Sequence, residues 1–276
     1  MNKQVKKKPA QAKISVIEKA VVASAQLTRY SVKDKDKPVM TTDGLVAFVD
    51  KGVSTWHFDI TNKAAIKPTT TGTPHVSVTA DWLDTQQALE QGVKVVHGTS
   101  ANSFGGMGAL LLPDHFSIPT VLASPENVRY YGLTLIETDS DFAISSPQFE
   151  MAMMRYNYGK DYKKDFLMQK HGGGGIFVET HNFPHIHIPL SSECGGYIVI
   201  GKVVAPRKYH FTAFRIPYKH ALYTPANTIH GDGTLVGEYA LTVSDSAFCH
   251  ANTVLMYNRN TLSMAKNVVP DWKPKP

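Results

Sequence analysis

The sequence is poor in cysteine. Only Cys194 and Cys249 occur among its 276 residues. Two thiols are too few for a disulfide framework or for a zinc site built from thiolates. Nothing therefore points to an oxidising compartment, and we expect the default of a reducing one, the cytoplasm.

Long apolar runs are missing as well. No uninterrupted apolar stretch approaches the roughly 20 residues that a membrane-spanning helix needs, so we expect no membrane span. Hydrophobic residues make up 42% of the chain and charged residues 19%. This balance is typical of a globular protein, and the chain is long enough to bury a substantial core.

Acidic residues are absent from the first 13 positions, which carry five lysines. The formal net charge is +6, but the rest of the chain is almost neutral, with 24 basic and 23 acidic residues. We interpret residues 1–13 as a basic, disordered arm. A nucleic-acid partner is not indicated, because no basic stripe interleaved with aromatics appears elsewhere.

The remaining chain separates into two parts by its patterns. Residues 14–170 predict a mixed α/β half, with helices over 80–91 (capped by Thr79) and 147–156. Residues 171–265, after a run of four glycines, predict many short strands, and residues 266–276 a tail. The glycines do not predict a phosphate loop, since neither a lysine nor a helix follows. Regularly spaced short strands predict a mainly β fold, a sandwich or jelly roll. The strands are expected over 176–179, 185–189, 196–204, 209–217, 220–223, 235–243 and 253–257.

Histidine is plentiful, with twelve in the chain, and two groups stand in strand-like sequence of the second part. The first contains His181, His185 and His187, and the second is His230 in the segment 225–233. Residues two apart on a strand point to the same face, so His185 and His187 can present their imidazoles together. A carboxylate and another histidine from neighbouring strands would complete a mixed nitrogen and oxygen metal site.

This spacing resembles the cupin superfamily, whose members are small jelly-roll β-barrels. One cupin signature contains His-x-His, a glutamate shortly afterwards and a later glycine, which here are His185, His187, Glu193 and Gly201. The other is Pro-x-Gly-x-x-His and matches the segment 225–230, which ends in His230. Asn227 replaces the glycine of that signature and tolerates the left-handed turn that glycine would adopt.

The resemblance implies that His185, His187, Glu193 and His230 bind one divalent metal ion: iron(II), manganese, nickel, cobalt or zinc. Five residues separate His187 from Glu193, one more than the family pattern. A one-residue shift turns a strand side chain to the opposite face. A bulge at 191–192 can restore Glu193. Otherwise Glu179 or His181 can take its place. Residues 14–170 show no such motif pair and are expected to be a mixed half or a degenerate, metal-free second cupin.

The resemblance further implies a metal-dependent enzyme acting on a small polar molecule. Oxygen activation, as in a dioxygenase, is the preferred chemistry. The alternative is isomerase or lyase chemistry, which needs a general base such as Glu179, Asp232 or Glu238. Two further readings stay open: a non-catalytic cupin that binds a small ligand or metal, and an interaction protein that recruits a partner. A homodimer is one option for the oligomeric state.

Overall fold

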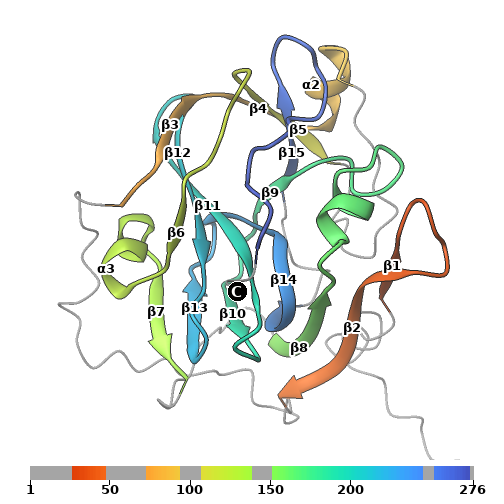
Figure 1. Cartoon of the computed structure of the whole chain (residues 1–276). Helices are drawn as coiled ribbons and strands as arrows, with labels where there is room; N and C mark the ends of the chain where they lie inside the picture. The colour runs from red at the N-terminus through yellow and green to blue at the C-terminus, as the bar shows by residue number, and fades with distance from the viewer. Residues whose placement is uncertain (1–26, 48–72, 94–106, 139–150, 245–251, 274–276) are drawn as a thin grey trace, which may run out of the picture.

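The structure is a computed structural model that describes residues 27–47, 73–93, 107–138, 151–244 and 252–273 (Figure 1). Within these ranges strands dominate and helices are few and short. The prediction of a mainly β protein is therefore confirmed. None of the described helices is long and apolar enough to cross a membrane.

The described part of the first 170 residues contributes eight strands and four short helical segments. The strands are β1 (Thr28–Tyr30), β2 (Pro38–Ala47), β3 (Val76–Thr79), β4 (Asp81–Leu83), β5 (Gly108–Leu112), β6 (Thr120–Leu122), β7 (Thr134–Glu137) and β8 (Met151–Tyr158). The helical segments are α2 (Thr85–Glu90), α3 (Pro125–Val128), the 3₁₀ turn η2 (Arg129–Tyr131) and the π-helical turn η3 (Lys163–Leu167).

The second part is almost entirely strand. Its members are β9 (Phe177–Thr180), β10 (His185–Pro189), β11 (Gly195–Ala205), β12 (Lys208–Arg215), β13 (His220–Thr224), β14 (Ile229–Ser244) and β15 (Asn252–Asn258). The predicted strand over 185–189 is confirmed residue for residue, and the other six overlap observed strands.

Strand β14 is the hub of the sheet. Its first half pairs with β11 and, at His230, with β9, whereas its second half pairs with β8 and β10. Between the two halves lies Gly237, whose backbone has a φ of 98°. A positive φ is accessible to glycine without a Cβ penalty, so the strand can change direction there. One long strand thereby serves two sets of neighbours (Figure 1).

Strands from the two parts of the sequence pair with one another. β8 lies beside β14, β5 beside β15, β7 beside β13, and both β3 and β6 beside β12. The boundary predicted near residue 171 thus separates, in sequence, strands that are hydrogen-bonded neighbours in space.

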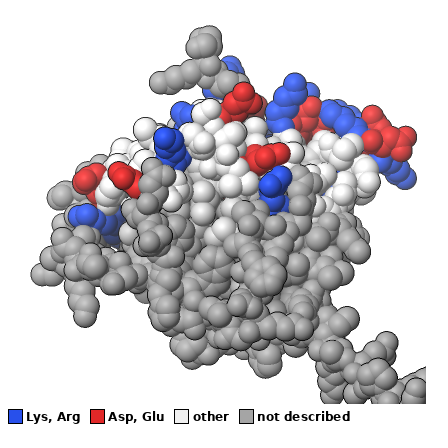
Figure 2. Space-filling model, turned by 90° about the horizontal axis from the view of Figure 1, so that it is seen from below, with Lys and Arg blue, Asp and Glu red and all other residues white. Residues whose placement is uncertain are grey.

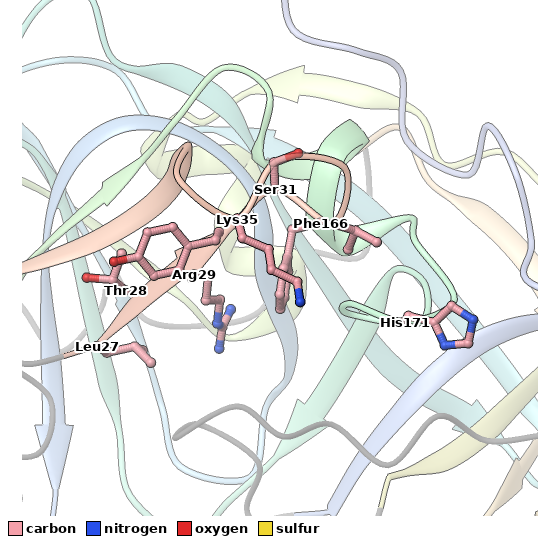
Figure 3. A pocket seen from close by; sticks show the side chains of 9 residues that line it. Leu27, Thr28, Arg29, Ser31, Lys35, Phe166 and His171 are labelled. Atoms are coloured by element: carbon pink, nitrogen blue, oxygen red, sulfur yellow. The ribbon is translucent and has the colours of Figure 1, made fainter.

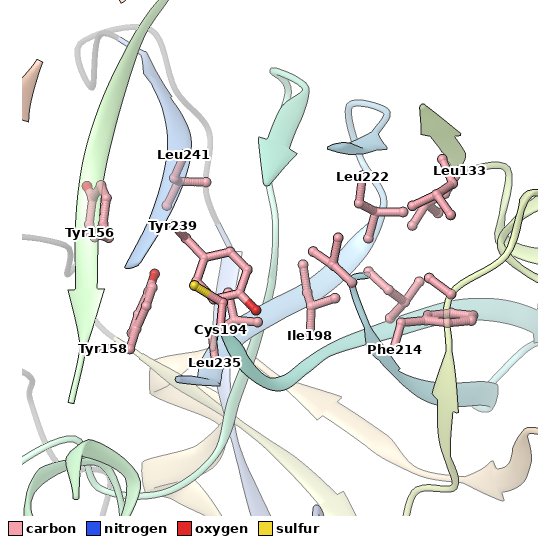
Figure 4. Close-up of a cluster of buried hydrophobic side chains, with 14 of the residues drawn as sticks. Leu133, Tyr156, Tyr158, Cys194, Ile198, Phe214, Leu222, Leu235, Tyr239 and Leu241 are labelled. Carbon is pink, nitrogen blue, oxygen red and sulfur yellow. The ribbon is translucent and has the colours of Figure 1, made fainter. Parts of the chain in front are cut away.

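The largest buried cluster is rich in tyrosine. Tyr239 is fully buried, and its ring packs edge-on against that of Tyr158, with the centroids 6.3 Å apart (Figure 4). Ile198, Phe214 and Leu222 extend the cluster across the neighbouring strands. The Tyr239 hydroxyl donates to the Gly195 carbonyl at 2.9 Å, which satisfies the polar end of a buried ring.

The segment predicted as a tail packs onto the sheet. Val268 and Val269 are buried in a second cluster, and the Val268 carbonyl accepts from the Ile118 amide at 2.8 Å. Trp272 covers Gly195, where an added Cβ would lie 2.1 Å from the indole ring. Arg215 stacks on the same indole, 4.4 Å from the ring centre. These contacts cover the described residues up to 273.

Both predicted helices differ from the structure. The chain enters β4 at Asp81 and becomes helical only at Thr85, so the prediction of a helix over 80–91 was wrong in its first turn. The helix begins there because Asp84 forms a reciprocal capping box with Gln87. The helix predicted over 147–156 is wrong from Met151 onward, where β8 runs. This strand pairs on both edges and buries its first four residues in succession, so it lacks the alternation that identifies a strand in sequence. Residues 147–150 lie outside the described part.

The described surface seen in Figure 2 carries lysine and arginine side chains interspersed with aspartate and glutamate. Among these described side chains neither sign of charge forms a patch of its own.

Candidate metal centre

Four side chains from three neighbouring segments of the sheet lie close together. Glu179 lies near the end of β9, His181 directly follows that strand, His185 begins β10, and His230 lies on β14. Each offers one ligand atom, and these four atoms all lie within 4.8 Å of one another. We call these four residues the metal group.

The pairing of the strands explains this convergence. Glu179 and His230 are direct cross-strand partners of β9 and β14, and residues opposite one another present side chains a few ångströms apart. The turn before His230 is also attached to the first histidine segment, because the Asn227 amide donates to the His181 carbonyl at 2.7 Å. Asn227 has a φ of 62°, the left-handed conformation expected of it in place of glycine.

The hydrogen bonds of His181 and His230 determine where their protons lie. The Nδ1 of His181 lies 2.7 Å from the Phe183 carbonyl, and the Nδ1 of His230 lies 2.9 Å from the Thr228 carbonyl. A carbonyl oxygen only accepts, so in each neutral ring Nδ1 carries the proton and Nε2 carries a lone pair.

The two Nε2 atoms face each other at 3.2 Å. With a lone pair on each, this arrangement is repulsive unless a cation lies between them or beside them. Backbone carbonyls that fix the outer nitrogen are also the usual support of a metal-binding histidine. The residues present therefore fit a divalent metal ion.

Burial keeps the imidazoles in the neutral form that binds metals. His181 and His230 are each 2% exposed, and His185 is 8% exposed. Loss of solvation lowers the pKa of His181 to about 3 and that of His230 to about 4. The pKa of His185 also lies well below its ordinary value, first through burial and then through the neighbouring histidines. No proton has to leave these rings before a metal binds near neutral pH.

Glu179 supplies the carboxylate of the group. Its Oε1 lies 3.7 Å from His230 Nε2, and its Oε2 accepts from the Thr253 hydroxyl at 3.0 Å. Burial, with the charge of Asp232 beside it, raises the pKa of Glu179 to about 8. A cation at the group would favour the ionised form.

His187 and Asp232 form a second pair beside the group. The His187 ring centre is 5.4 Å from that of His185, but its Nε2 points to Asp232 Oδ2 at 3.8 Å. Both ring nitrogens of His187 are buried without a hydrogen-bond partner among the described residues. Asp232 accepts from the Tyr158 hydroxyl at 2.7 Å. Burial would raise the pKa of Asp232, but His187 and Tyr158 hold it below its ordinary value.

Two other sequence-based candidates lie apart from the metal group. Glu193 is exposed in the turn between β10 and β11, while Cys194 beside it is buried. Glu238 lies further along β14, where it is the cross-strand partner of Asn157 on β8. The sequence-based metal set thus contributes His185 and His230 to the group, and His187 lies beside it.

Glu179 and His181 complete the group in place of Glu193 and His187. From the sequence, Glu179 and His181 are each expected only as a replacement for Glu193, because the cupin pattern places the carboxylate after His187. One signal was available: they are two residues apart at the end of a strand, the same spacing that singles out His185 and His187.

Comparisons with models of known protein families, with curated proteins and with solved structures give no match. The likeness to cupins rests on the histidine spacing and on the mainly β fold with its buried group of one glutamate and three histidines.

Proposed function

We propose that the protein is a metal-dependent enzyme of cupin type, with a jelly-roll barrel, that acts on a small polar molecule. The observation that carries this proposal is the pair of Nε2 atoms of His181 and His230, 3.2 Å apart with lone pairs facing each other. His185 and Glu179 each offer a ligand atom within 4.8 Å of those of His181 and His230, and they complete a set of three imidazoles and one carboxylate.

This donor set suits iron(II), manganese, nickel, cobalt or zinc. A metal held there would act as a Lewis acid or, if it is iron, would activate dioxygen. Four protein ligands leave coordination positions for a substrate and a second small molecule in an octahedral ion. This supports a dioxygenase as the first choice.

Isomerase or lyase chemistry is the second candidate, and the pair beside the group favours it. The Asp232 carboxylate is ionised and lies beside the group, so a proton acceptor is present there, but the pKa that His187 and Tyr158 lower makes it a weak base. Asp232 would then be the base, and Tyr158 would hold its carboxylate in place. Glu179, which the sequence also suggested as a base, belongs to the metal group in this proposal. Glu238 is not given a part.

Metal content tests the proposal directly. Protein purified without added metal should hold about one divalent ion per chain by elemental analysis. The double variant His181→Ala, His230→Ala should lose it. His115→Asn is the matched control, because His115 is an exposed histidine in a left-handed turn, a conformation that asparagine tolerates. Equal metal content in the double variant and the wild type would refute the site.

The two chemistries can be separated with iron(II)-loaded protein. Exposure to nitric oxide without oxygen should give the electron paramagnetic resonance signal of a high-spin iron–nitrosyl species, since nitric oxide occupies a position open to dioxygen. Oxygen uptake with a panel of small carboxylates and phenols would then identify a dioxygenase substrate. Without a nitrosyl signal in iron-loaded protein, the dioxygenase proposal fails, and the isomerase, lyase and non-catalytic alternatives remain.

A further inference from the structure

A pocket of about 530 Å³ opens beside β1 and the turn that follows it (Figure 3). Its size lies in the range of small-molecule sites. Its basic lining residues are Arg29, Lys35 and His171, and no acidic residue lines it. We propose that this pocket binds a small organic carboxylate, with the Arg29 guanidinium as the main contact to its charged end.

Arg29 is the strongest reason for this assignment. Its Nη1 donates to the Tyr162 hydroxyl, and its guanidinium lies 5.7 Å from the centre of that ring. Its Nε is buried without a hydrogen-bond partner, and among the described residues the nearest opposing charge that acts on it is that of Asp232, which forms no ion pair with it. Buried charges are ordinarily paired. A carboxylate is the planar anion whose two oxygens match a guanidinium.

Lys35 adds a second positive charge at the pocket. The neighbouring Lys37 is already neutralised by Asp161 at 2.7 Å and Asp165 at 3.1 Å. Lys35 forms no ion pair within the described residues, although Asp34 and Asp36 flank it in sequence. Its exposed position fits a steering charge at the mouth of the pocket.

The rest of the lining combines apolar side chains with Thr28, Tyr30 and Ser31. Leu27, Val32 and Phe166 contribute to its wall, and the Arg29 guanidinium lies 5.5 Å from the centre of the Phe166 ring. A ligand with a ring or short hydrocarbon body can therefore pack on these side chains while its carboxylate meets Arg29. This combination favours an organic acid over inorganic phosphate.

The glycine run packs against two residues that line the pocket, Val32 and Phe166. A Cβ added to Gly172 would lie 2.4 Å from the Phe166 carbonyl and 3.0 Å from a Val32 methyl group. Only glycine allows the turn to approach that closely, and this approach places His171 at the pocket. The run that did not fit a phosphate loop thus has a packing role.

The pocket does not depend on the metal group, but it lies within electrostatic reach of it. Burial raises the pKa of Glu179, and the charge of Arg29 lowers it again in part. None of the four residues of the metal group lines the pocket. The proposal therefore stands or fails separately from the proposed function.

Isothermal titration calorimetry of the full-length protein with sodium benzoate measures the affinity for a small carboxylate and so tests the proposal. Benzamide, which has the same shape without the charge, should bind at least tenfold more weakly. Arg29→Gln should weaken benzoate binding at least tenfold and Lys35→Gln a few fold. Lys35 is exposed, so that variant remains informative if Arg29→Gln does not fold.

Three outcomes would overturn the assignment. They are equal binding of benzoate and benzamide, benzoate affinity unchanged in both the Arg29 and the Lys35 variants, and tighter binding of phosphate than of benzoate. The variant His181→Ala, His230→Ala separates the pocket from the metal group, since it should keep the benzoate affinity of the wild type. If that variant loses benzoate binding along with its metal, the ligand binds at the metal group and the pocket assignment is wrong.

Discussion

His181 and His230 meet through their Nε2 atoms, 3.2 Å apart, each held in place by a backbone carbonyl on the opposite side of its ring. The two residues are 49 positions apart in the chain. The Asn227 amide that donates to the His181 carbonyl fixes the distance between their segments. Two lone pairs held at this distance repel each other when no cation is present. A bound cation would replace this repulsion by attraction to both nitrogen atoms.

Glu179 and Glu193 give opposite expectations for metal affinity. Glu179→Gln should weaken metal binding by more than the roughly 10–100-fold that loss of a supporting hydrogen bond costs, because it removes the carboxylate ligand. Glu193→Gln is the matched control and should leave the affinity unchanged, since Glu193 is exposed. A competition titration with a chromophoric chelator measures both. If Glu193→Gln bound the metal more weakly than Glu179→Gln, Glu193 would be the metal ligand, as the cupin pattern predicts.

Thr253 should act on the metal through Glu179. Its hydroxyl donates to Glu179 Oε2 at 3.0 Å and so orients the carboxylate. Thr253→Val should lower metal affinity by roughly 10–100-fold. Thr253→Ser keeps the hydroxyl and should bind nearly as well as the wild type. Equal losses in the two variants would indicate a packing effect of the methyl group instead.

The metal-free protein should be sensitive to acid. The pKa values of His181 and His230 are about 3 and 4 in the folded protein, below their ordinary value. In the unfolded chain these rings take up protons near pH 6.5, so unfolding binds protons and stability falls as the pH drops from about 6.5 towards 4. Thermal unfolding of metal-free protein over this range should show a falling Tm.

Replacement of both rings checks the origin of this effect. In the variant His181→Gln, His230→Gln, the decline of Tm between pH 6.5 and 4 should be smaller. An equally steep decline would assign the acid sensitivity to other groups.

Glu179 has the opposite effect on stability, between its ordinary pKa of 4.5 and about pH 8. Its pKa of about 8 in the folded protein exceeds its ordinary value. Its contribution to the stability of the metal-free protein is therefore present at low pH and is lost as the pH rises to about 8. Metal binding, which requires the ionised carboxylate, should strengthen over the same interval. Glu179→Gln should remove both trends, and their persistence in that variant would exclude Glu179 as the titrating group.

The contact between Gly195 and Trp272 predicts a coupled pair of variants. Gly195→Ala should destabilise the protein by about 1–3 kcal/mol, because the new methyl group would collide with the indole ring. In a Trp272→Ala background the same change should cost much less, since the space is vacated. Chemical denaturation of the four proteins in a double-mutant cycle gives the coupling. Additive effects would mean that residue 272 does not pack against this strand.

The strands of the second part could be predicted from sequence because their pattern is local. The predicted and observed bounds of β10 coincide residue for residue. Its successive residues alternate between polar and apolar, and a turn signal precedes them. β8 could not be recognised, because a strand paired on both edges and buried in succession resembles an apolar helix. The sequence offers two candidate N-caps for α2, Thr79 and Asp84. The helix starts after Asp84 because Asp84 and Gln87 cap each other reciprocally.

The metal group could be predicted only in part, because some of its residues are brought together by contacts between strands and not by a local pattern. His185 and His230 follow from spacing within a single segment. The choice of Glu179 over Glu193 depends on the register between β9 and β14, which places Glu179 opposite His230. Register between strands is set by the whole sheet and cannot be read from either segment alone.

The change of partners along β14 links assembly of the fold to occupancy of the metal group. His230 lies on the half of β14 that pairs with β9 and β11, while His185 lies on β10, which pairs with the other half. A metal bound by both residues would tie the two sets of strands together across the bend at Gly237. Removing the metal should then increase amide hydrogen exchange first at this junction, and much less in β4 and β5, which pair with each other and carry no residue of the metal group.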